Sequence, residues 1–80
     1  MVPAAVVSLL MVYTTADLNM ADSHVAQGER HIVQQEEIVA RLRAHGLPTE
    51  QAELLLVQFH ATLAQHRAHR NLMLRELRGG

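Results

Sequence analysis

The stretch Ala44–Glu50 constrains this chain most, because it stops one helix and starts another almost at once. Gly46 can adopt the left-handed conformation that follows a helix end, where a side chain would be strained. Leu47 then stands where the Schellman motif places an apolar residue, and its expected contact is Leu42. Pro48 has no backbone N–H and keeps Leu47 out of helical space, so the first helix cannot continue.

The residues after the proline have the pattern of a helix start. Thr49 is the expected N-cap, with its hydroxyl accepting a hydrogen bond from a backbone N–H of the first turn. Glu50 and Glu53 place negative charge near the positive end of that helix. A connection this short makes the two helices antiparallel. The sequence therefore predicts an all-α fold, an antiparallel helical hairpin over residues 17–80.

Composition limits the functions that such a hairpin can have. The chain has 80 residues, no cysteine, one Phe, one Tyr, no Trp and a formal charge of −1. Without cysteine there is no disulfide, no thiolate metal site and no cysteine nucleophile, which fits a cytoplasmic protein. So few aromatic side chains argue against base stacking, and so little net charge argues against nucleic-acid or membrane partners.

Residues 1–16 form an apolar N-terminal extension that differs from the rest. Its run Val2–Val12 has no charged side chain and is too short to span a bilayer, which takes about 20 apolar residues. We expect a loosely packed segment or a short docked helix. A secretory signal is a minor alternative, because no Lys or Arg precedes the run. The extension is not native at all if translation begins at Met20.

The first helix, residues 17–44, is predicted from a seven-residue recurrence on one side. Its facing rows are Leu18, Val25, Ile32, Val39 and Ala21, Gly28, Gln35, Leu42. Gly28 costs about 1 kcal/mol relative to Ala inside a helix. We expect Gly28 and Gln35 to face the region of His66 and Arg70, forming a polar layer that sets the register.

The second helix, residues 50–77, has apolar residues on two sides. The side expected to face the first helix carries Ala52, Leu55, Leu56, Phe59, Thr62, Leu63, His66, Arg70, Met73 and Leu77. The opposite side carries Leu54, Val57, Ala61, Ala64, Ala68 and Leu72. A helix that is apolar on two sides is normally buried on two sides, so this pattern predicts a homodimer completing a four-helix bundle. The alternative is that the alanines only raise helix propensity.

Six histidines raise the question of a metal site. His60, His66 and His69 lie close together in sequence, and an antiparallel hairpin could add His31 and Glu29 to His66. However, no Glu-x-x-His or His-Glu-x-x-His motif occurs, and bundle metal sites supply carboxylates that point inward from several helices. We therefore predict no metal or other cofactor and keep a histidine-rich metal binder as the third functional hypothesis.

Three arginines of the second helix, Arg67, Arg75 and Arg78, form a weakly basic stripe. This stripe is the basis of the second hypothesis, a small nucleic-acid-binding or regulatory protein. Without aromatics, a Gly-rich loop or a recognition motif, such arginines are usually a solvated face. No nucleophile elbow or phosphate-binding loop is present, so we do not expect an enzyme.

Four segments resemble a group of short bacterial proteins without known activity. They are Gly28–Ile32, Ile38–Arg43, Gly46–Glu53 and His66–Arg70, and the likeness extends over Ala26–Leu77, about two thirds of the chain. The resemblance implies a helical hairpin and brings no activity or binding residue with it. The favoured function is a non-enzymatic, self-associating interaction or scaffold module.

Overall fold

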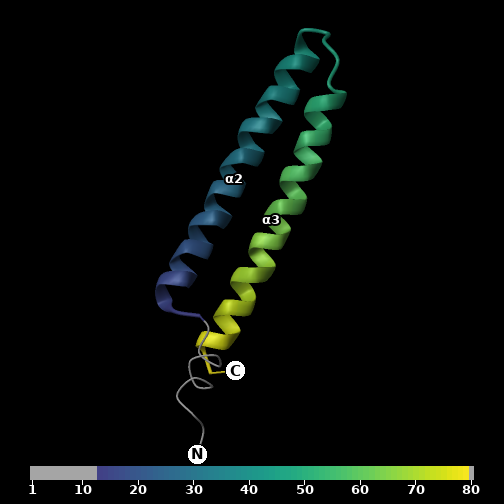
Figure 1. The fold of residues 1–80 in the computed structure, drawn as a ribbon. Coiled ribbons are helices and arrows are strands. Elements are labelled where there is room, and N and C mark those ends of the chain that lie inside the picture. The colour runs from purple at the N-terminus through teal and green to yellow at the C-terminus, as the bar shows by residue number, and fades with distance from the viewer. Residues whose placement is uncertain (1–12, 80) are drawn as a thin grey trace, which may run out of the picture.

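The computed structural model describes residues 13–79, which form two helices connected by a short turn. Helix α2 spans Thr15–Ala44 and helix α3 spans Glu50–Leu77. They run antiparallel and side by side over their whole length (Figure 1). The predicted all-α hairpin is confirmed, and no strand occurs in the described part of the chain. The predictions for the run Val2–Val12 lie outside the described residues.

The turn has the hydrogen bonds of a Schellman motif. Gly46 has a φ of 66°, and its N–H donates to the carbonyl of Arg43 at 3.1 Å. The N–H of Leu47 donates to the carbonyl of Leu42 at 2.9 Å. These two bonds satisfy carbonyls that the end of α2 would otherwise leave unpaired. The predicted helix stop is confirmed, although the side chain of Leu47 stays 53% exposed.

We expect Gly46→Ala to lower the free energy of unfolding by roughly 1 kcal/mol. A Cβ at this position would meet no atom within 4 Å, so the loss is conformational and not a clash. Denaturant unfolding followed by circular dichroism measures the loss. A variant as stable as the wild type would show that the left-handed conformation at Gly46 is not needed to end the helix.

Thr49 occupies the predicted N-cap position, but its predicted hydroxyl cap is wrong. Its φ of −111° and ψ of −5° lie near helical space, and its side chain makes no capping hydrogen bond. A capping hydroxyl normally requires an extended backbone. Instead the Thr49 carbonyl accepts the N–H of Glu53 at 2.8 Å. The Glu53 carboxylate pairs with Arg43 across the turn, in an exposed ion pair that adds little stability.

The side-chain cap that the sequence analysis missed lies at the start of α2. The Asp17 N–H donates to the Thr14 hydroxyl at 3.1 Å, and the Thr14 N–H donates to the Asp17 carboxylate at 2.9 Å. This reciprocal capping box starts the helix at Thr15. Helix α2 thus begins two residues before residue 17, where the hairpin was predicted to start.

The core is the seam between the helices, and the predicted rows of α2 face it. Val25, Ile32 and Leu63 form the buried centre, with Leu56 and Phe59 packed against it. The other buried apolar residues of the described chain are Ala21, Val39 and Met73. The seven-residue recurrence in α2 is thus confirmed as the core face of that helix.

Gly28 lies in the same groove as His66, but the predicted polar layer with Gln35 and Arg70 does not form. A Cβ on Gly28 would lie 3.1 Å from Cδ1 of Leu63, so the missing side chain makes room for a leucine and not for a polar group. Gln35 is buried and donates from Nε2 to the carbonyl of Ala52 at 2.9 Å, near the turn. Arg70 lies 3.8 Å from the carboxylate of Asp22, at the other end of the hairpin. The polar contacts are therefore distributed along the seam and do not form one layer.

Candidate interaction surface and histidine groove

One face of α3 is apolar and points away from α2. We call it the outer face, and it consists of Leu54, Val57, Ala61, Ala64, Ala68 and Leu72. All six residues are exposed, with Leu54 at 56% and Val57 at 62%. On the opposite side of the same helix, Leu63 is only 3% exposed. The two apolar stripes predicted for this helix are both present. Helix α2 covers most of the inner one, although Leu55 and Leu77 stay 39% exposed, and leaves the outer one uncovered.

The middle of the outer face is lined by small side chains. Ala61, Ala64 and Ala68 lie one helical turn apart in succession, with larger apolar residues at both ends, Leu54 and Leu72. A row of alanines lets another helix approach closely, because no long side chain separates the two backbones. The outer face therefore has the shape and polarity of a helix-packing surface.

The three arginines of the predicted stripe are all exposed, and two of them line the same hollow. Arg75 and Arg78 line a shallow hollow together with Ala68, Asn71 and Leu74. Arg67 is exposed on the same helix but is not among these lining residues. Arg75 follows Ala68 by two helical turns, which places it at the C-terminal end of the outer face.

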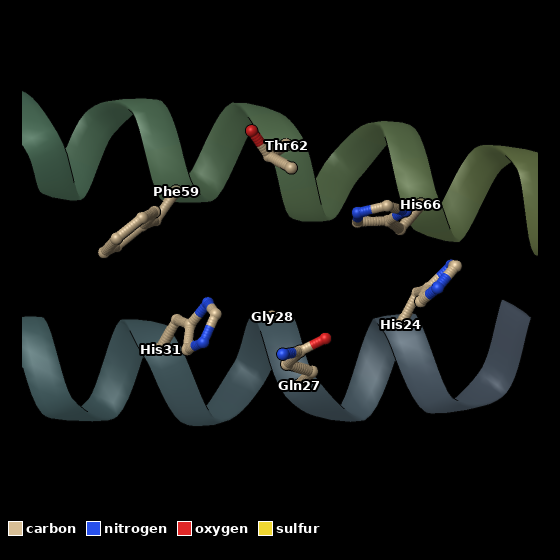
Figure 2. A pocket seen from close by; sticks show the side chains of 7 residues that line it. All are labelled: His24, Gln27, Gly28, His31, Phe59, Thr62 and His66. Carbon is tan, nitrogen blue, oxygen red and sulfur yellow. The ribbon is translucent and has the colours of Figure 1, made fainter. Parts of the chain in front are cut away.

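Three of the six histidines lie on a different side of the hairpin, in a groove between α2 and α3. This histidine groove is lined by His24, Gln27, Gly28, His31, Phe59, Thr62 and His66 (Figure 2). The ring centroids of His24 and His66 lie 5.3 Å apart, and those of His31 and Phe59 lie 5.6 Å apart. The groove holds about 230 Å³, below the roughly 300–1,000 Å³ typical of small-molecule sites.

His66 and His31 line the same groove, as suggested, but they form no metal-binding group with Glu29. Gly28 of α2 faces Leu63 of α3. Because the helices are antiparallel, His66, one turn after Leu63, lies beside His24, which is one turn before Gly28. His69, three residues after His66, packs edge-on against Tyr13, and the two ring centroids lie 5.7 Å apart. His60 is exposed. Among residues 13–79, no three His, Asp or Glu side chains are grouped closely enough to hold a metal ion together.

Neither α2 nor α3 combines the length and the apolar content that a bilayer-spanning helix needs.

Comparisons with protein-family models, with curated proteins and with solved structures find no match to this chain. The resemblance to short bacterial helical-hairpin proteins therefore stays a prediction that rests on the quoted segments.

Proposed function

We propose that this protein is a non-enzymatic, self-associating helical hairpin that serves as an interaction or scaffold module. Two copies would pack α3 against α3 to give four helices, with one α2 on each side. The outer face supports this proposal, because it is a continuous apolar stripe that α2 leaves uncovered. A stripe of this length on a soluble protein marks an interaction site.

The spacing of the outer face favours a second copy of the same chain as its occupant. The stripe has nearly the same spacing read in either direction, with its midpoint between Ala61 and Ala64. In an antiparallel pair related by a twofold axis, Leu54 would lie opposite the partner's Leu72, and Ala61 opposite the partner's Ala64. Such an interface is self-complementary, as a twofold dimer requires.

The charges at the two ends of the outer face favour the same arrangement. Glu50 precedes Leu54 by one turn, and Arg75 follows Leu72 at the other end. Both residues are exposed. The antiparallel pairing that matches Ala61 with the partner's Ala64 also brings Glu50 near the partner's Arg75. The twofold axis makes this contact twice, once at each end.

A charge-reversal series tests this proposal. Glu50→Arg or Arg75→Glu alone should weaken dimerisation roughly three- to tenfold, because each places like charges together at both ends. The double variant Glu50→Arg/Arg75→Glu should recover most of the lost affinity. Sedimentation equilibrium gives the three dissociation constants. A double variant weaker than both single variants would contradict the antiparallel pairing.

The wild-type mass tests self-association itself. We expect light scattering to give the mass of two chains at tens of micromolar. Because each single reversal also opposes the dipole of α3, helix content is recorded for every variant. A wild type with the mass of one chain and full helix content would refute the proposal.

A further inference from the structure

The paired rings of His24 and His66 are the contact that the core does not explain. The two residues come from different helices, and their rings lie between the two ribbons, tilted by 45° (Figure 2). Neither residue belongs to the apolar centre formed by Val25, Ile32 and Leu63. His24 is exposed and His66 is half-buried, so solvent reaches the pair.

We propose that His24 and His66 together bind one divalent transition-metal ion of the Zn²⁺, Ni²⁺ or Cu²⁺ class. Imidazole nitrogen suits these ions. Zn–N bonds of about 2.0–2.1 Å with tetrahedral angles place the centroids of two bound imidazole rings roughly 5.2 Å apart. The observed separation is 5.3 Å. The packed helices therefore hold the two rings at a centroid separation that is compatible with a shared ion.

The surroundings of the pair leave room for a cation, since Arg70, one turn after His66, is paired with Asp22 at 3.8 Å. A second hollow continues past the two histidines and is lined by Asp17, Met20, Ala21, His24, His66, His69 and Met73. Neither this hollow nor the histidine groove has an arginine among its lining residues. The Asp17 carboxylate accepts the Thr14 N–H at 2.9 Å and adds negative charge on this side.

The remaining ligands of the ion would be water. Gln27 and Thr62 line the groove beside the pair, and their side-chain oxygens are suitable hydrogen-bond acceptors for metal-bound water. His69 packs on Tyr13, and no group of three ligands exists in the described chain. The site is thus a two-histidine clip between α2 and α3.

A metal bound this way must stabilise the hairpin, because its two ligands meet only when the helices are packed. Ligands that bind the folded state in preference to the unfolded one raise the melting temperature by mass action. With saturating Zn²⁺ at pH 7.5 we expect the melting temperature to rise by about 5 °C relative to EDTA.

Variants identify the ligands. His24→Gln and His66→Gln should each abolish the Zn²⁺-induced rise, whatever their melting temperature in EDTA. Two matched controls should keep it: His31→Gln, which lies in the same groove, and His60→Gln, which is exposed on α3. Equilibrium dialysis at saturating Zn²⁺ should find one more bound ion per chain in the wild type than in either of the first two variants.

The clip is independent of the proposed dimer, because both of its ligands come from one chain. The Zn²⁺-induced rise should therefore persist in Ala61→Arg, whose substitution lies on the outer face. Failure of that variant to dissociate would affect only the proposed function. Three results would refute the clip: no rise with Zn²⁺, Ni²⁺ or Cu²⁺, a rise that survives His24→Gln or His66→Gln, or equal losses in the two control variants.

Discussion

Ala61→Arg should convert the protein to a monomer at concentrations where the wild type is a dimer. Ala61 lies at the middle of the outer face, and the proposed twofold pairing places it against the partner's Ala64. The variant would bury two guanidinium groups at the centre of the interface without a counter-charge, which costs several kcal/mol. We therefore expect the dissociation constant to rise by about a hundredfold or more. Light scattering coupled to size exclusion measures the mass.

Ala40→Arg is the matched control, because it makes the same substitution at an exposed alanine of α2. Both changes have the same effect on helix propensity, so a difference in mass between the two variants reports the surface and not the helix. The control should remain a dimer. If Ala61→Arg stays dimeric too, or if both variants dissociate alike, the outer face of α3 is not the interface.

Leu63→Ala should lower the free energy of unfolding by about 3 kcal/mol. Leu63 is the one residue of α3 in the buried centre, where it joins Val25 and Ile32 from the other helix. The hairpin has a single layer of buried residues between its two helices. No further layer of side chains can therefore move in to fill the cavity that this change leaves. Urea unfolding at a fixed chain concentration gives the loss, because the proposed self-association would make stability depend on concentration.

A substitution at Gly28 tests the packing contact between Gly28 and Leu63. Gly28→Leu should cost about 1–3 kcal/mol, because the new side chain would occupy the space that Leu63 fills. The double variant Gly28→Leu/Leu63→Ala should lose less than the two single variants together, since one leucine replaces the other. Val33→Ala, on an exposed side of α2, should change stability by less than about 0.5 kcal/mol. Strict additivity would mean that Gly28 and Leu63 are not in contact.

The parts of the structure that were predictable from sequence are the ones that depend on nearby residues. The end of α2 follows from Gly46 and Pro48, because backbone conformation at these two residue types is decided locally. The core face of α2 follows from its seven-residue recurrence, since helical geometry alone puts those residues on one side. The uncovered apolar side of α3 was visible for the same reason.

The incorrect predictions concern features that depend on the backbone geometry of the turn or on the register between the helices. The hydroxyl of Thr49 does not cap α3, because the turn holds its backbone near helical space. The capping box is visible in the sequence as a Thr-x-x-Asp spacing, but the predicted boundary between extension and hairpin separates Thr14 from Asp17. The partner of His66 depends on the register of α3 against α2. The period of apolar residues along each helix does not specify that register.

The sequence by itself determined two long antiparallel helices, where the first ends, and which sides of both are apolar. These features follow from residue type and from spacing along one helix. Only the tertiary structure decided the register of the two helices. A small shift of one helix along the other would leave every apolar residue on the same side of its own helix, so the apolar pattern does not distinguish one register from the next. What selects the register is the fit of Leu63 over Gly28 and the hydrogen bond from Gln35 to Ala52. That register also brings His24 and His66 together, so the proposed metal clip became visible only in three dimensions.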